Sequence, residues 1–246
     1  MLLTDPRVDP SVNCNAAIRY AAKKGYQELV QILLADARVD PSDHFNSAIS
    51  YAALNGHLEV IELLLSDSRV DPSANDNYPI RYAAQKGHLR VVELLITDSR
   101  VDPSADDNLA VRVAAEHGHF SVVELLMSDS RVDPSTGNNY AIRFAAQNGH
   151  TKIVRMLLAD SRVDPSDPDN SAIQHAARRG HHEIVKMLLS DSRVNPSVYV
   201  NQALRYAAQC GHHKVVDILV TDARVDPSSD DNYALRWAVT NGHHEV

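Results

Sequence analysis

Histidine is the residue type in this chain most able to do chemistry, because imidazole nitrogens bind metals such as zinc. The chain has 13 histidines, and most of them follow a glycine. These are His57, His88, His119, His150, His181, His212 and His243. Zinc needs three or four converging ligands, whereas this column supplies one histidine per repeat. We therefore predict a structural role for the column, with no metal site and no cofactor.

Asp-Ser-Arg, as at Asp98-Ser99-Arg100, also contains residue types that enzymes use. It occurs in nearly every repeat, which is how scaffold residues behave. The sequence contains no Cys-x-x-Cys, phosphate-binding loop, nucleophile elbow or His-Glu-x-x-His motif. We predict that the chain is not an enzyme.

The elements that position these residues form a tandem array. The string Arg-Val-Asp-Pro-Ser returns every 31 residues, starting at Arg7, Arg38, Arg69, Arg100, Arg131, Arg162, Arg193 (with Asn195 for Asp) and Arg224. A glycine column from Gly25 to Gly242 and an asparagine column from Asn15 to Asn232 keep the same register. A fixed period of this length marks stacked repeats. We predict a single solenoid over 1–246 in which each repeat contacts only its neighbours.

The predicted units follow from the asparagine column. They are a partial unit 1–14, full units at about 15–45, 46–76, 77–107, 108–138, 139–169, 170–200 and 201–231, and a partial unit 232–246.

Each repeat is predicted to contain two helices, and the third repeat illustrates them. Asn77 is a good N-cap for the first helix, since its side-chain oxygen can accept a backbone N–H. Gly87 tolerates the left-handed conformation that closes a helix, and the pair Ala83-Ala84 suggests close packing. The second helix is expected over about 88–97 and is apolar over most of its circumference, which predicts burial on several sides.

Composition limits the partners. The net charge of −8 argues against binding nucleic acid or an anionic membrane over the whole surface, because both need a cationic field. No stretch approaches the length of about 18 apolar residues typical of a membrane span. Cys14 and Cys210 lie about six repeats apart, so a reducing compartment fits best. We expect a cytoplasmic protein, or one of the host-cell cytoplasm if the source is viral.

The third repeat resembles the ankyrin repeat. The family pattern runs from Thr-Pro-Leu-His through Ala-Ala and Gly-His to Val-Val-x-Leu-Leu, and the chain follows it with Pro79-Ile80-Arg81-Tyr82, Ala83-Ala84, Gly87-His88, Val91-Val92 and Leu94-Leu95. The resemblance covers the whole chain, and its Asp-Ser-Arg-Val-Asp-Pro-Ser form is similar to arrays of large DNA viruses and protists. It implies an ankyrin-like helix-turn-helix solenoid and a protein or peptide partner.

The repeat departs from the family pattern in its length, which is 31 residues rather than about 33. One residue is lost after the second helix and one before the first, where the hairpin glycine of the family is absent. We therefore predict an all-α fold with short, irregular connecting loops and little or no paired strand.

Two surfaces are candidates for binding a partner. The resemblance implies that the first helix lines the concave face, where aromatic and arginine columns suit interface hot spots. The candidates there are Tyr20, Tyr51, Tyr82, Phe144, Tyr206, Trp237, Arg81, Arg112 and Arg143. The second surface is the loop tips, where Phe45 and Tyr199 are aromatic. The alternatives are that the aromatics pack between first helices, that the arginines pair with loop aspartates, and that the tips vary without consequence.

The function predicted from these features is a protein–protein interaction scaffold. The chain begins with the tail of a repeat and stops within a second helix. This leaves two alternatives: a head-to-tail self-associating element, or the targeting fragment of a larger adaptor or enzyme.

Overall fold

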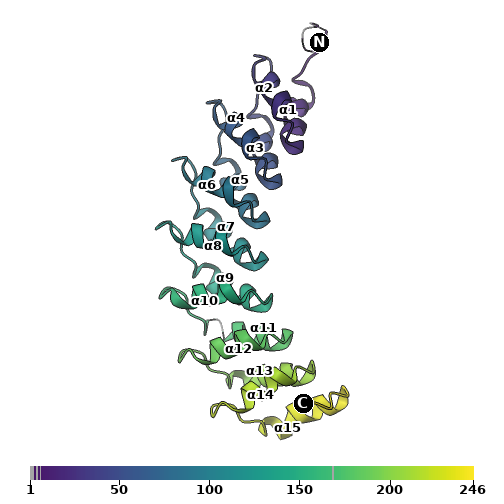
Figure 1. Ribbon diagram of the computed structural model, residues 1–246, viewed down its shortest axis with the longest axis vertical. Helices are drawn as coiled ribbons and strands as arrows, with labels where there is room; N and C mark the ends of the chain where they lie inside the picture. The colour runs from purple at the N-terminus through teal and green to yellow at the C-terminus, as the bar shows by residue number, and fades with distance from the viewer. Residues whose placement is uncertain (1–2, 4, 6, 168) are drawn as a thin grey trace. The chain divides into compact units, whose positions relative to one another are not determined.

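The computed structural model describes residues 3, 5, 7–167 and 169–246. This part of the chain contains fifteen α-helices and no β-strand (Figure 1). The helices are α1 (Val12–Lys24), α2 (Gln27–Leu34), α3 (Asp43–Asn55), α4 (Leu58–Leu65), α5 (Ala74–Lys86), α6 (Leu89–Ile96), α7 (Ala105–His117), α8 (Phe120–Met127), α9 (Thr136–Gln147), α10 (Thr151–Ala159), α11 (Ser171–Arg179), α12 (His182–Leu189), α13 (Val198–Gln209), α14 (His213–Val220) and α15 (Ser229–Thr240). Residues 1, 2, 4, 6 and 168, which include parts of the predicted first unit and of one predicted tip, lie outside the described residues.

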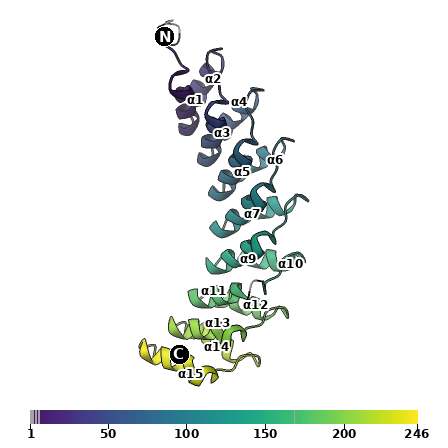
Figure 2. The same ribbon diagram turned by 180° about the vertical axis from the view of Figure 1, so that it is seen from behind.

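The chain divides into two compact units. Unit 1 consists of Met1–Ala114 and Ser121–Val132, and unit 2 of Ala115–Phe120 and Asp133–Val246. Within unit 1, α1, α3 and α5 contact one another in turn, and so do α2, α4 and α6 (Figures 1 and 2). Within unit 2, the helices α9, α11, α13 and α15 form one row and α10, α12 and α14 the other. The predicted all-α solenoid of helix pairs is confirmed.

The first helices of a unit pack closely because small residues lie between them. Ala83 and Ala84 of α5 are completely buried, as are Ala52 and Ala53 of the neighbouring α3. An alanine side chain adds only one methyl group, so two helix backbones can approach each other without leaving a cavity. The alanine pairs therefore have the packing role that the sequence suggested.

The second helices bury one stripe of side chains. In α6, Val91, Val92 and Leu95 are buried, whereas Leu94 and Ile96 keep part of their surface exposed. Residues three and four apart share a helix face, and this face points to the core. The helix also spans eight residues, and the expected burial on several sides is not found.

The Gly-His columns form a single packing feature that joins successive repeats. Gly180 ends α11 in the left-handed conformation, with φ +78°. The ring of His212 in the next repeat lies against it, so a Cβ atom on Gly180 would be only 2.7 Å from Nδ1. The Nε2–H of the same ring donates to the carbonyl oxygen of Arg178 at 3.0 Å. Glycine is therefore required both by its φ angle and by the space that the histidine occupies.

The Asp-x-Arg columns also join repeats. The guanidinium of Arg100 donates from Nε to Asp98 Oδ1 at 2.9 Å and from Nη2 to Asp98 Oδ2 at 2.6 Å. Its Nη1 donates to the carbonyl oxygen of Val70 in the preceding repeat at 2.8 Å. Charge-assisted, bidentate contacts of this kind are among the stronger hydrogen bonds. The recurring aspartate and arginine are thus scaffold residues.

The predicted role of the asparagine column is wrong. Asn77 makes no side-chain hydrogen bond that caps its own helix. Its Oδ1 instead accepts the backbone N–H of Asp102, in the loop that leads to α7, the next first helix, at 2.8 Å. Asp102 in turn accepts the backbone N–H and the hydroxyl of Ser104, at 2.9 and 2.6 Å. The asparagine therefore ties two repeats together at the loop that precedes each first helix.

The tips are left-handed turns rather than irregular loops. In α5 the residues Asn75, Asp76 and Asn77 have φ angles of +54°, +54° and +61°, and the right-handed helix starts after them. Left-handed geometry costs an L-residue about 1–2 kcal/mol, and asparagine and aspartate tolerate it best. This turn places the start of α5 at Ala74, three residues before the predicted boundary at 77.

Candidate functional site

The arginine column of the first helices holds the left-handed turns in place. Arg81 is 7% exposed, forms an ion pair with Asp106, and donates from Nη2 to the carbonyl oxygen of Asn75 at 3.0 Å. Arg143 donates to the carbonyl oxygens of Asn138 and Gly137 at 2.9 and 3.1 Å. A turn with its carbonyls aligned is a natural acceptor for a guanidinium group.

Arg112 makes the same kind of contact. Its Nη1 donates to the carbonyl oxygen and the carboxylate of Asp107, both at 3.1 Å. Each of the three predicted binding arginines thus contacts the turn at the start of its own helix, and Arg81 also pairs with Asp106 at the start of α7. Their contribution to a partner site stays a prediction.

The aromatic column lies beside these arginines, with its rings at different depths. Tyr20 is 62% exposed, whereas Tyr51, Tyr82, Phe144, Tyr206 and Trp237 are partly buried. Several of the rings lie near a cation: Lys23 Nζ is 5.6 Å from the centre of the Tyr51 ring, and the Arg178 guanidinium is 5.4 Å from that of Tyr206. Contacts within about 6 Å are attractive.

A second aromatic column, four residues earlier on the same helix, was not predicted. Tyr140 stacks on Phe144 with ring centres 4.0 Å apart, Tyr78 lies 5.2 Å from Tyr82, and Tyr233 lies 5.8 Å from Trp237. Residues i and i+4 share a helix face, so the spacing contained the necessary information.

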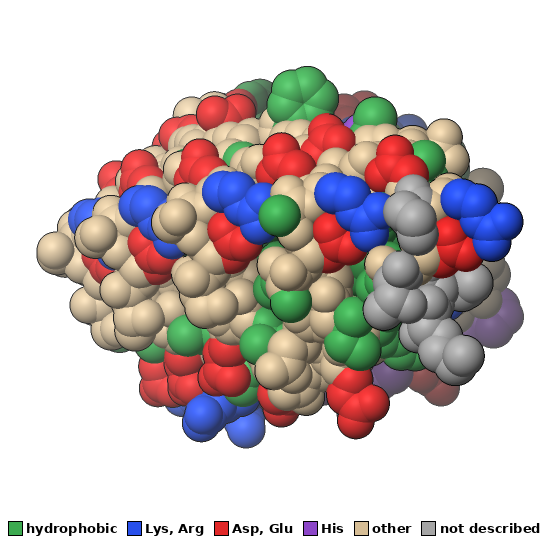
Figure 3. Space-filling model, turned by 90° about the horizontal axis from the view of Figure 1, so that it is seen from above, with side chains coloured by type: hydrophobic (Ala, Val, Ile, Leu, Met, Phe, Trp, Pro, Cys, Tyr) green, Lys and Arg blue, Asp and Glu red, His purple; other side chains and the backbone are tan. Residues whose placement is uncertain are grey.

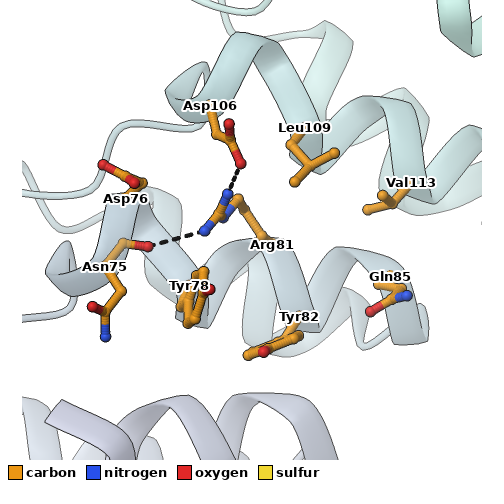
Figure 4. Close-up of a pocket in the computed structure, with 9 residues that line it drawn as sticks. All are labelled: Asn75, Asp76, Tyr78, Arg81, Tyr82, Gln85, Asp106, Leu109 and Val113. Atoms are coloured by element: carbon orange, nitrogen blue, oxygen red, sulfur yellow. Dashed lines mark hydrogen bonds and ion pairs between the residues drawn. The ribbon is translucent and has the colours of Figure 1, made fainter. Parts of the chain in front are cut away.

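A hollow of about 430 Å³ lies between α5 and α7 in unit 1. Tyr78 and Tyr82 lie next to each other on α5, while Leu109 and Val113 extend from α7 (Figure 4). Arg81 lies between the two helices, with its guanidinium 4.5 Å from the centre of the Tyr78 ring. We call this the α5–α7 hollow. It combines an aromatic wall, an aliphatic wall and an anchored cation.

Unit 2 has a hollow of a different character, of about 360 Å³. It is lined by Gln147 of α9, by His175, Arg178 and Arg179 of α11, and by Cys210, which follows α13. The lining contains no acidic side chain. We call this the α11 hollow.

One family model matches this chain in overlapping segments over most of its length. The family model for ankyrin repeats, which covers three copies at a time, matches residues 1–76, 18–107, 67–138, 111–202 and 142–231. The chain belongs to the ankyrin repeat family. Ankyrin repeats are in general protein–protein interaction modules, and the family is typically a non-enzymatic scaffold. A search of curated proteins found no match to this chain.

The tips of these ankyrin repeats expose two of the predicted contact residues. Phe45 is 73% exposed, and Tyr199 is 54% exposed beside the half-exposed Val200. A hydrogen bond to Asp169 raises the pKa of Tyr199. Tyr199 belongs to unit 2 and Phe45 to unit 1, where Asn75 Nδ2, in the lining of the α5–α7 hollow, donates to the carbonyl oxygen of Phe45 at 3.1 Å. Their role in binding stays a prediction.

Charged side chains of the scaffold alternate in sign. The face drawn in Figure 3 carries acidic and basic side chains next to one another. The Arg38 guanidinium lowers the pKa of the Asp36 carboxyl to about 2, and the arginines two residues beyond Asp98 and Asp191 lower the pKa of those carboxyls in the same way.

The described residues contain no group of three or more His, Cys, Asp or Glu side chains that could hold a metal ion. None of the helices in this part of the chain is long and apolar enough to cross a membrane.

Proposed function

We propose that this ankyrin-repeat protein binds a peptide segment of a partner protein in the α5–α7 hollow. The observation that supports the proposal is the meeting of an aromatic pair and an aliphatic pair around an open volume of about 430 Å³. A volume of this size accommodates one large side chain and its flanking backbone. Tyrosine and arginine are enriched among the residues that dominate interface energies.

The walls favour an apolar anchor residue in the partner. Leu109 and Val113 remain partly exposed, so an aliphatic or aromatic side chain inserted between the helices would cover them. Burial of apolar surface contributes about 25 cal/mol per Å². Tyr78 and Tyr82 offer flat rings with hydroxyl groups at their ends, which suit a segment that is apolar at one point and polar at its edges.

Arg81 makes the site rigid before a partner arrives. Its ion pair with Asp106 and its bond to the Asn75 carbonyl connect α5 to α7, as the dashed lines in Figure 4 show. A preorganised site loses less conformational entropy on binding. The arginine thus supports the hollow by positioning its walls, and its ring contact with Tyr78 holds that side chain in place.

The experiment is a peptide-library selection on the intact chain. Selected peptides are measured against Tyr82→Ala and Val113→Asp, and Tyr26→Ala is the matched control. Tyr26 is 55% exposed and precedes the second helix α2, away from the hollow. We expect each variant in the hollow to weaken binding by about tenfold or more and the control to leave it unchanged. Equal affinities for all variants would refute the proposed site.

A further inference from the structure

Two arginines without an acidic partner in the described chain line the α11 hollow, and the guanidinium of one of them, Arg178, lies 5.4 Å from the centre of the Tyr206 ring. Arg178 and Arg179 are both exposed, in the last turn of α11, and no ion pair to either is found among the described residues. Eight of the other sixteen arginines pair with an aspartate two residues earlier, as Arg193 does with Asp191. Arg178 and Arg179 are also the only two adjacent arginines in the sequence, which has a net charge of −8.

The groups around this pair add polar atoms and no negative charge. His175 Nδ1 is buried without a hydrogen-bond partner. Burial is the largest cause that lowers the pKa of His175, and the charges of Arg143, Arg178 and Arg179 lower it further. The ring is therefore neutral at pH 7. Gln147 and Cys210 complete the lining. The arrangement offers two guanidinium groups and neutral polar side chains around an open volume of about 360 Å³.

We infer that the α11 hollow binds an anionic side chain of a partner peptide, either a carboxylate or a phosphoryl group. Guanidinium groups bind both through paired, charge-assisted hydrogen bonds. The inference rests on the proposed function, because it assigns to a peptide partner a second contact point, on a first helix of unit 2. A polynucleotide is disfavoured by the overall negative charge, and the test includes it as an outcome.

The two cysteines allow a direct test in the intact chain. Cys210 lines the hollow, whereas Cys14 lies in the tip that begins α1, and both are exposed. An occupant of the α11 hollow covers the Cys210 thiol and slows its alkylation by iodoacetamide. Cys14 serves as the reference within the same molecule. The rate ratio of the two sites, followed by mass spectrometry, is therefore independent of reagent concentration.

The probes are capped peptides that are identical except at one central residue: glutamate, phosphoserine or glutamine. We expect the glutamate and phosphoserine peptides to protect Cys210 and the glutamine peptide to bind at least about tenfold more weakly. The relative affinities of the glutamate and phosphoserine peptides show which source of the anion the site prefers. Protection by a single-stranded oligonucleotide at equal charge, without protection by either acidic peptide, would overturn the assignment to a peptide.

Matched variants separate this inference from the proposed function. Arg178→Gln and Arg179→Gln should each abolish most of the protection, whereas Arg155→Gln removes an exposed arginine from the second helix α10 and should not alter it. A peptide that binds the α5–α7 hollow but leaves Cys210 unprotected overturns the inference alone. Failure of every peptide at both hollows overturns both.

Discussion

The hydrogen bond that ties successive repeats together can be measured with two neighbouring asparagines. Asn139 and Asn138 have nearly the same backbone geometry, with φ angles of +55° and +56°. Asn139 is 4% exposed, and its Oδ1 accepts the backbone N–H of Asp164, in the loop that leads to α11, the next first helix, at 2.8 Å. Asn138 is exposed, and among the described contacts its side chain makes no hydrogen bond.

Replacing either residue by alanine costs about 1 kcal/mol, because alanine tolerates the left-handed region less well than asparagine. Asn139→Ala additionally leaves the N–H of Asp164 without its acceptor, which costs about 1–3 kcal/mol at a part-buried site. We therefore expect Asn139→Ala to destabilise the protein by about 2–4 kcal/mol and Asn138→Ala by about 1. The difference between the variants reports the side-chain hydrogen bonds of Asn139, whose Nδ2 also donates to Asp167 Oδ2 at 3.2 Å.

The assay is equilibrium unfolding in urea, with the loss of helix monitored by circular dichroism. With a slope of about 2 kcal/mol per molar urea, the two variants should differ by about 0.5–1.5 M in midpoint. Repeat arrays can unfold in parts, so hydrogen exchange at the Asp164 amide provides a local measurement. Equal midpoints, together with unchanged exchange at Asp164, would refute the inter-repeat role of the asparagine.

Three other predictions test the remaining scaffold contacts. Gly180→Ala should destabilise the protein clearly more than Gly242→Ala in thermal melts, because both sites have positive φ but only at Gly180 would a Cβ meet the next repeat's histidine ring. Val200→Asn should stabilise the fold by about 1 kcal/mol in urea melts, since Val200 is β-branched at φ +57°. Val12→Asn, the control at a similarly exposed valine without positive φ, should give no such gain. The pKa of Asp98 is lower in the folded protein than its unfolded value of 3.8, so the stability that Asp98 contributes should be lost only as the pH falls below 3.8. Asp98→Asn should therefore reduce the loss of stability with falling pH in this range. An unchanged pH dependence would contradict the role of the arginine partner.

The helix pairs and their packing could be predicted from the sequence because each structural requirement recurs from repeat to repeat. A glycine that must have positive φ and a histidine that fills the space beside it appear as two columns in fixed register. The asparagine column was misinterpreted because an N-cap and a left-handed residue favour the same amino acids. Three consecutive left-handed residues are locally unfavourable, so local propensities cannot predict them. They are stabilised by hydrogen bonds to the neighbouring repeat, which a single repeat does not show.

The candidate site was predicted less completely for a related reason. The aromatic column through Tyr82 was identified, but its partners four residues earlier, such as Tyr78, occupy a position that varies among tyrosine, leucine, serine, alanine and glutamine. A column that varies gives no periodic pattern to detect. Its importance becomes visible only when the ring contacts and the hollow between α5 and α7 are known.

Both hollows lie where the aromatic column is interrupted. At the position of Tyr82, α7 has Val113 and α11 has His175, and each of these residues lines one of the two hollows. A shorter or more polar side chain at this position leaves volume beside its neighbours that a tyrosine would fill. Identical repeats would offer a partner several equivalent registers, with no difference in free energy among them. Interruptions of the column make the repeats unequal, and a difference in affinity between registers is what specificity requires.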